Sequence, residues 1–139
     1  MSPWDFFLLG TYMVKDPARL IAAYDDSEVV SADFNLNLLR VLNHTLNADF
    51  DPSAFRHIAE WNANAGRMEM RLAPDDAQKI RIADLELDVV FEAGERMLTE
   101  ISTKFTPAQV SSELESAGFE VDCVWHDRAG DFQLTLVKR

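Results

Sequence analysis

The sequence predicts an α+β fold, a mainly antiparallel sheet with flanking helices. Three observations predict this class. Helix-capping signals come first along the chain, a period-two alternation of apolar and polar residues begins near residue 57, and a helix followed by two strands closes the sequence. No internal repeat or low-complexity segment breaks this order. With 139 residues, the chain is expected to form one domain around one hydrophobic core.

A strand and a short helix are expected at the start of the chain. Residues 6–12, Phe-Phe-Leu-Leu-Gly-Thr-Tyr, form an apolar run typical of a strand buried inside a sheet. Asp16 and Pro17 then supply an N-cap and a proline at the first helical position. The helix should continue to about Tyr24, where a turn at residues 25–27 ends it.

A longer helix is expected next. Ser31 is a suitable N-cap, and apolar residues at helical spacing continue to about Leu46. Asn35 and Asn37 lie inside this helix, where asparagine is a mediocre helix former. For Asn37 a solvated helix face is the favoured interpretation. Asp51-Pro52 repeats the cap-and-proline signal for one or two more turns.

Strands dominate the middle of the chain, and a helix and a hairpin end it. Strands are predicted over residues 67–72, 79–82, 87–91 and 98–105, separated by turns at residues 73–76 and 92–95. Thr106 and Pro107 begin a helix that Gly118 ends. Residues 119–125 and 132–137 should form the closing hairpin.

Composition limits the classes of partner. The formal net charge is −11, with 13 basic and 24 acidic residues, so a nucleic-acid partner is not expected. No window approaches the roughly 20 apolar residues of a membrane span, so a membrane partner is not expected either. The single Cys123 cannot form an internal disulfide, and residues 4–9 are too short and lack the basic flank of a signal peptide. We therefore expect a cytoplasmic protein.

Motifs for a cofactor, a metal or a nucleophile are not recognised. The five glycines are scattered and form no Gly-rich loop between a strand and a helix. The three histidines, His44, His57 and His126, lack metal-ligand spacing. The proximity of His57 to Glu60 in the sequence is one that chance supplies readily. No order of Ser, His and Asp suggests a catalytic triad, so neither a catalytic residue nor a metal site is predicted.

The predicted strand at residues 98–105 carries the most informative polar pair. Side chains alternate along a strand, so Glu100 and Ser102 point the same way, about 7 Å apart. An ionised carboxylate only accepts hydrogen bonds, whereas a hydroxyl donates and accepts, so this pair suits a small ligand rich in N–H donors. Judged on the strand alone, a solvated face is the simpler interpretation.

Short segments along the whole chain share one resemblance. They are Leu8-Leu9-Gly10, Val14-Lys15-Asp16, Ala-Ala-Tyr-Asp-Asp at 22–26, Phe-Asn-Leu-Asn-Leu-Leu at 34–39, Ala-Asp-Phe-Asp at 48–51, Met-Glu-Met-Arg-Leu at 68–72, Phe91 with Gly94-Glu95, and Thr-Glu-Ile-Ser-Thr-Lys-Phe at 99–105. In this order they resemble the second half of the S-adenosylmethionine-dependent L-histidine Nα-methyltransferases, which trimethylate histidine on the route to ergothioneine.

The resemblance implies a site. The substrate-binding residues that it implies are Tyr24, Ser31, Phe34, Met70, Glu100 and Ser102. Of these, Glu100 and Ser102 would hold the imidazole ring, and the other four would line the histidine pocket. The carboxylate would select a ring N–H donor through a charge-assisted hydrogen bond.

The resemblance also implies a division of the chain. Family members are more than twice this long, and their Rossmann-like half, which binds S-adenosylmethionine and the substrate amine, would lie outside this chain. Residues 1–15 would then be a remnant strand and linker of the cofactor domain, and residues 16–139 the substrate-recognition domain. The chain alone would bind no cofactor and catalyse no reaction. Its apolar first strand would favour a homodimer.

Two functions stay open on the sequence. One is the substrate-binding portion of a methyltransferase that acts on the α-amine of histidine or a related amino acid, with S-adenosylmethionine bound by the full-length protein. The other is a stand-alone module that binds a small ligand or another protein and has no catalytic activity.

Overall fold

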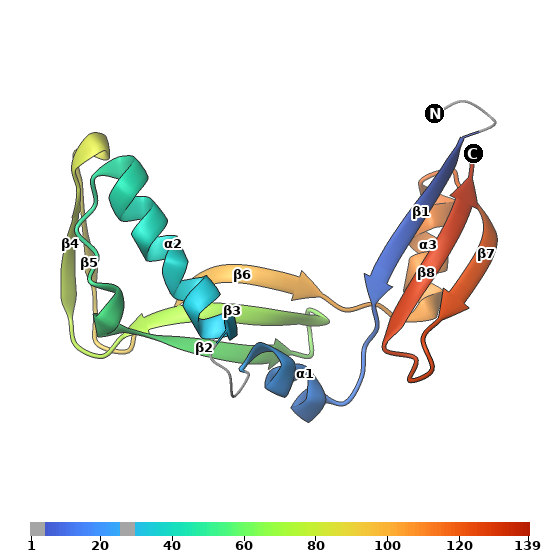
Figure 1. Cartoon of the computed structure of the whole chain (residues 1–139), viewed down its shortest axis with the longest axis horizontal. Helices are drawn as coiled ribbons and strands as arrows, with labels where there is room; N and C mark the ends of the chain where they lie inside the picture. Colours follow the sequence, from blue (N-terminus) through green and yellow to red (C-terminus); the bar gives the residue numbers. More distant parts are fainter. Residues whose placement is uncertain (1–4, 26–29) are drawn as a thin grey trace. The chain divides into compact units, whose positions relative to one another are not determined.

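The chain forms two compact units, each with its own hydrophobic cluster. A computed structural model describes residues 5–25 and 30–139, and within them it has three α-helices and eight strands (Figure 1). The predicted α+β class is confirmed. The expectation of one core is wrong, because the first strand pairs with the last one and each unit has its own buried cluster.

Unit 1 contains the first strand and the end of the chain. Its segments are Met1–Asp16, Ala63–Arg67 and Thr103–Arg139. Its strands are β1 (Phe6–Tyr12), β7 (Glu120–His126) and β8 (Phe132–Lys138). The sheet order is β1-β8-β7, and both neighbours run antiparallel to β8. The predicted closing hairpin is therefore confirmed.

Helix α3 (Pro107–Ser116) belongs to unit 1 and begins with a reciprocal cap. The Gln109 N–H donates to the Thr106 hydroxyl over 3.3 Å, and the Thr106 N–H donates to the Gln109 side chain over 2.8 Å. Gly118 follows the helix with φ of +82°, the left-handed region that glycine favours. Val110 of α3 packs against Val137 of β8 in the unit's cluster. Both predicted ends of this helix are confirmed.

Unit 2 contains the middle of the chain. Its segments are Pro17–Asn62 and Met68–Ser102. Its helices are α1 (Pro17–Tyr24) and α2 (Val30–Leu46), with short 3-10 helices η1 (Pro52–Ala54) and η2 (Ala83–Leu85). One sheet has the order β2-β3-β6, formed by β2 (Phe55–Asn62), β3 (Arg67–Pro74) and β6 (Met97–Thr103). An antiparallel pair is formed by β4 (Gln78–Ile82) and β5 (Leu87–Phe91).

The core of unit 2 holds α2 against its strands. Its buried residues are Leu39, Phe50, Phe55, Leu72, Ile80, Ile82 and Phe91. The rings of Phe55 and Phe91 meet edge to face, with centroids 5.9 Å apart. Asn43 of α2 exchanges two hydrogen bonds, of 2.7 and 2.9 Å, with the Phe50 backbone. This exchange ties the end of α2 to the segment that enters β2.

Two details near the start of α2 differ from expectation or cannot be compared. Ser31 was expected as the N-cap, and this is wrong because the backbone is already helical at Val30, which places Ser31 inside the first turn. Most of the turn expected at residues 25–27 lies outside the described residues. Asn37 is exposed as expected, whereas Asn35 is buried.

Strand β1 is correct in its bounds and wrong in its expected burial. Phe6 and Leu8 are 59% and 54% exposed. The reason is that β1 lies at one end of its sheet order, with β8 as its paired neighbour from Phe6↔Lys138 to Tyr12↔Phe132. The predicted division after residue 15 lies next to the end of the first segment of unit 1, but residues 103–139 share that unit with β1.

Candidate functional site

The side chains implied as a histidine pocket lie together in unit 2. A hollow of about 290 Å³ is lined by Ala23, Tyr24, Val30, Ser31, Phe34, Met70 and Glu100. These residues come from the end of α1, the first turns of α2, and strands β3 and β6. Segments that are distant in the sequence therefore supply the walls of one concavity.

The two large apolar walls differ in burial. Met70, on the middle strand of its sheet, is 4% exposed, so it forms a deep wall of the hollow. Phe34 is 66% exposed, so its ring stands toward solvent. A flat ring that entered the hollow past Phe34 would meet the Met70 side chain, and contacts between sulfur and aromatic rings are favourable.

Ser102 joins the hollow through a hydrogen bond. The Tyr24 hydroxyl donates to Ser102 Oγ over 2.8 Å. Glu100 and Ser102 are two residues apart on β6, so they share a face of the strand. Of the six implied residues, five line the hollow and the sixth is bonded to one of the five. Their convergence is therefore observed, and their role in binding stays a prediction.

A second, smaller hollow borders the first. It has a volume of about 220 Å³ and is lined by Phe34, Asn35, Asn37, Leu38, Thr99 and Glu100. Phe34 and Glu100 belong to both hollows. Glu100 is exposed, so its side chain is accessible to a ligand.

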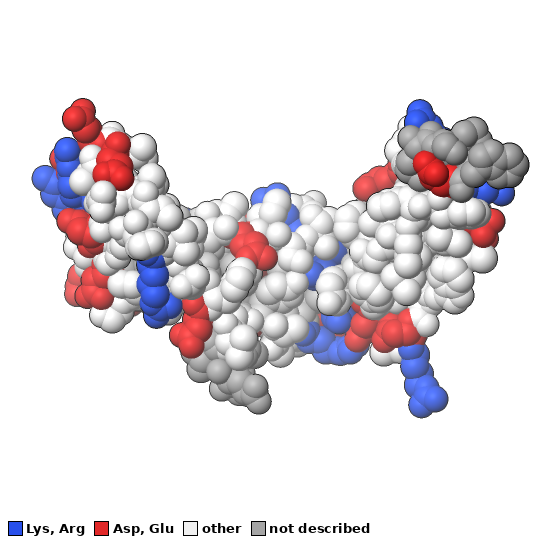
Figure 2. Space-filling model, turned by 45° about the horizontal axis from the view of Figure 1, so that its top comes forward, with Lys and Arg blue, Asp and Glu red and all other residues white. Residues whose placement is uncertain are grey.

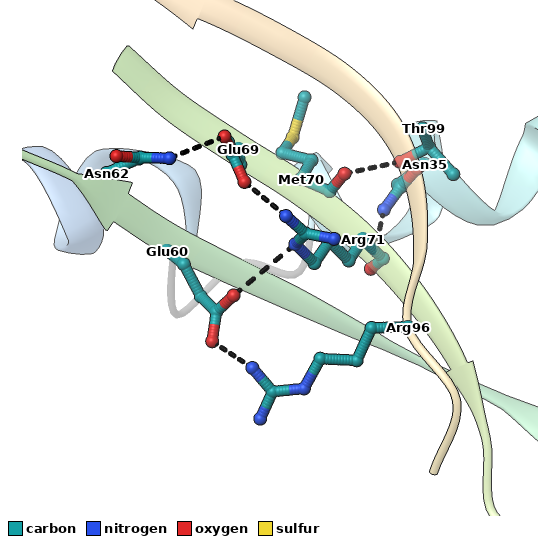
Figure 3. A network of polar contacts seen from close by, with 8 residues as sticks. All are labelled: Asn35, Glu60, Asn62, Glu69, Met70, Arg71, Arg96 and Thr99. Carbon is teal, nitrogen blue, oxygen red and sulfur yellow. Dashed lines mark hydrogen bonds and ion pairs between the residues drawn. The ribbon is translucent and has the colours of Figure 1, made fainter. Parts of the chain in front are cut away.

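Two polar side chains tie the backbone of β3 to its neighbours (Figure 3). The Thr99 hydroxyl of β6 donates to the Met70 carbonyl over 2.9 Å. The Asn35 amide of α2 donates to the Arg71 carbonyl over 3.1 Å. The backbone that carries Met70 is thereby held both by the strand that carries Glu100 and by the helix that carries Phe34.

A charged network steadies the same strands. Glu69 on β3 is 3% exposed; its carboxylate accepts a 3.0 Å hydrogen bond from Asn62 and is paired with Arg71. Arg71 also meets Glu60 of β2 over 3.4 Å, and Glu60 is paired with Arg96 just before β6 (Figure 3). A buried carboxylate needs such partners because its desolvation is costly. The network therefore joins β2, β3 and the approach to β6.

Sequence reasoning missed three residues that support the hollow. Asn35, His57 and Thr99 each bond to the backbone of another element. His57 bonds to Tyr24 and Asn35, whereas Glu60, its neighbour in the sequence, is paired with arginines of β3 and the segment before β6. The one local signal was an asparagine inside a helix, which leaves its amide to find a partner elsewhere.

The described charged groups outside the hollow were compared with the requirements of a metal site. Among the described residues, no group of three or more His, Cys, Asp or Glu side chains is placed to hold a metal ion. On the face drawn in Figure 2, the described Lys and Arg residues are interspersed with Asp and Glu.

Hydrogen bonds from Ser53 lower the pKa of Asp51, and desolvation raises the pKa of the Cys123 thiol. None of the described helices is long and apolar enough to cross a membrane.

Comparison with known proteins identifies a family for the chain. The model of one family, described as histidine-specific and SAM-dependent methyltransferases, matches residues 1–139. The chain belongs to this family. The resemblance found in the sequence is thus confirmed.

Relatives in this family are longer than the chain. A histidine N-alpha-methyltransferase of Mycobacterium tuberculosis is 51% identical over 139 residues, which is 100% of this chain and 43% of the relative. One from Mycolicibacterium smegmatis gives the same identity and coverage. An L-tryptophan methyltransferase of Psilocybe serbica is 27% identical over 109 residues, 76% of this chain and 30% of that protein. The chain therefore spans less than half the length of these relatives.

Proposed function

We propose that this chain is the substrate-binding part of an S-adenosylmethionine-dependent methyltransferase that acts on the α-amine of histidine or a closely related amino acid. The observation that carries the proposal is one hollow that combines an acceptor, Glu100, with the Tyr24–Ser102 hydroxyl pair and the apolar walls Met70 and Phe34. The names of the relatives and of the family support the same substrate. No observation favours the stand-alone module.

The imidazole ring suits this combination. A ring N–H would donate to the Glu100 carboxylate, and a charge-assisted bond of this kind is stronger than a neutral one. Ser102 Oγ accepts a hydrogen bond from the Tyr24 hydroxyl. Toward the other ring nitrogen, the Ser102 hydroxyl is therefore better placed to donate than to accept. A site built on such bonds discriminates strongly against amino acids that lack the donor.

The contribution of these residues to the reaction would be positioning. S-adenosylmethionine, when bound to the full-length protein, supplies the methyl group on its sulfonium. The pocket would hold the ring end of the substrate, so that the neutral α-amine at the other end stays in line with that methyl group. Orientation alone can supply a large part of a rate enhancement. None of the residues lining the hollow is then required to move a proton.

The remaining assignments belong to the same proposal. We propose that residues 1–15 belong to the cofactor-binding half of the full-length protein and that residues 16–139, which include the pocket of unit 2, form its substrate-recognition part. The family description supports S-adenosylmethionine as the cofactor. A cytoplasmic location is supported by a single cysteine in the sequence. A role in ergothioneine synthesis rests on the family resemblance.

Methylation by the natural full-length protein tests the proposal. Incubation with S-adenosylmethionine and a panel of amino acids, followed by mass spectrometry, should show methylated histidine as the main product. Preferential methylation of an amino acid unrelated to histidine, or methylation of none, would contradict it. Calorimetry should show no saturable heat when S-adenosylmethionine is added to the isolated 139-residue chain. Micromolar binding there would place the cofactor site within this chain.

A further inference from the structure

A chain of three hydrogen bonds runs behind the proposed pocket, and His57 is at its centre. The imidazole Nε2 of His57 lies 2.9 Å from the Tyr24 carbonyl oxygen. Its Nδ1 lies 2.9 Å from the Asn35 side-chain nitrogen. The same nitrogen donates to the Arg71 carbonyl over 3.1 Å. Asn35 is 4% exposed, so its amide is buried. We call this chain of three hydrogen bonds, from Tyr24 through His57 and Asn35 to Arg71, the relay.

Backbone carbonyls fix the direction of each bond. A carbonyl oxygen only accepts, so Nε2 of His57 must carry the proton that meets Tyr24, and the Asn35 nitrogen must face Arg71 (Figure 3). The second proton of the Asn35 amide then points at Nδ1 of His57, which accepts it. All three bonds can exist together only when His57 is neutral and carries its proton on Nε2.

The relay supports a helix end that needs support. α1 has eight residues, too few for a helix to be stable by itself in water, and its described buried residue is Leu20. The Tyr24 carbonyl belongs to the last turn, where carbonyls have no donor within the helix. His57 supplies that donor from β2. His57 therefore helps to hold Tyr24, and with it the Tyr24–Ser102 bond, in place.

The bonded backbone positions coincide with or adjoin the walls of the pocket. Tyr24 itself lines the hollow, Asn35 follows Phe34, and the Arg71 carbonyl follows Met70. The relay thus links three walls, from α1, α2 and β3, without touching the hollow through the His57 ring. A residue placed in this way sets distances between walls and makes no contact with the ligand.

We propose that His57, held as the neutral Nε2–H tautomer, is a positioning residue that sets the spacing of the pocket walls and so determines selectivity for the imidazole ring. This inference rests on the proposed function. Loss of the His57 ring leaves the Tyr24 carbonyl and the Asn35 amide without these partners. The wall of Tyr24 then shifts relative to Glu100, and ring binding weakens while the methyl donor is still bound elsewhere.

Kinetics of the natural full-length protein test this role. His57→Phe, which keeps a ring and removes both polar atoms, should raise the histidine KM roughly tenfold and leave the S-adenosylmethionine KM unchanged. His57→Gln should recover part of the loss, since its amide can donate to Tyr24 or accept from Asn35. His44→Phe, on the exposed face of α2, is the matched control and should behave as wild type.

A double substitution separates positioning from general loosening of the fold. Asn35→Ala should raise the histidine KM as His57→Phe does, and the double variant should be no worse than the more affected single one, because both break the same relay. Additive effects would overturn the relay. An unchanged histidine KM in His57→Phe, or equal rises in the KM of both substrates, would overturn the positioning role.

Nitrogen-15 NMR of the wild-type protein gives a second readout that needs no folded variant. At neutral pH, His57 should show a protonated Nε2 and an unprotonated Nδ1. The opposite tautomer, or a doubly protonated ring, would contradict the relay. If wild-type protein methylates no histidine, the proposed function fails and this inference fails with it. If wild-type protein is active and the His57 variants match it, only this inference fails.

Discussion

Strand β3 of unit 2 and strand β1 of unit 1 have opposite relations between polarity and burial. β3 alternates charged and apolar side chains, yet none of its residues is exposed. β1 is largely apolar, yet Phe6, Leu8 and Tyr12 are exposed. β3 is the middle strand of its sheet and β1 is at one end of its own. The number of neighbouring strands, more than the polarity of the residues, decides burial in these two strands.

The comparison also shows what each kind of strand requires. A buried polar strand needs a partner for every charge, and β3 obtains these from Glu60, Asn62 and Arg71 around Glu69. An exposed apolar strand needs a cover, because an open edge with apolar side chains invites association with another chain. These two requirements lead to predictions that differ in the size of the expected effect.

The largest effect is expected when the buried carboxylate of β3, that of Glu69, is removed. Glu69→Ala should lower the free energy of unfolding by about 3 kcal/mol, because Arg71 is then left half-buried without its closest carboxylate. Asp75→Ala, which removes the exposed pair with Arg56, should cost less than about 1 kcal/mol. Urea unfolding of both variants measures the difference. Equal losses would show that the burial of Glu69 has no energetic consequence.

The exposed strand β1 should cause self-association of the isolated chain. Light scattering should find a dimer or larger species, and Leu8→Lys should shift it toward the monomer by adding a charge to the edge. Val90→Lys, at another exposed apolar position, is the matched control and should leave the association unchanged. A wild-type chain that stays monomeric at high concentration would contradict the prediction.

A smaller effect is expected in the turn that joins β7 to β8. Asp127 accepts backbone hydrogen bonds from Phe132, over 2.9 Å, and from Asp131 and Ala129, and these bonds lower its pKa. A carboxyl with a lowered folded pKa stabilises the fold above its unfolded pKa and loses that contribution as the pH falls through the folded value. The amide NMR signals of residues 129–132 should therefore shift below about pH 4. Asp127→Asn should remove that pH dependence, and its persistence would assign it to another group.

Local features were predictable from the sequence, and distant pairings were not. The cap of α3 involves Thr106 and Gln109, which are three residues apart, so a short local sequence pattern is enough to predict it. The relay through His57 joins residues 24, 35, 57 and 71, and no short pattern contains it. The start of α2 was misplaced by two residues, because a good capping residue such as Ser31 also tolerates the first turn of a helix.

The candidate site was predictable only as a set. Alternation along β6 placed Glu100 and Ser102 on one face. The prediction that Tyr24, Phe34 and Met70 belong to the same site came from the family resemblance. The burial of β3 on both faces was missed, because alternation of polar and apolar residues normally indicates one solvated face. The charges that make this burial possible find their partners on β2 and before β6.

The central claim is that the Glu100 carboxylate recognises the imidazole ring. In the natural full-length protein, the histidine KM of Glu100→Ala measures it most directly. We predict a rise of roughly ten- to a hundredfold, from the loss of about 1.5–3 kcal/mol, with an unchanged KM for S-adenosylmethionine and a relaxed preference for histidine. Ser102→Ala should cost less, because a neutral hydrogen bond is weaker, and Glu115→Ala, an exposed control on α3, should cost nothing. Unaltered histidine kinetics in Glu100→Ala would remove this residue from the site and contradict the account.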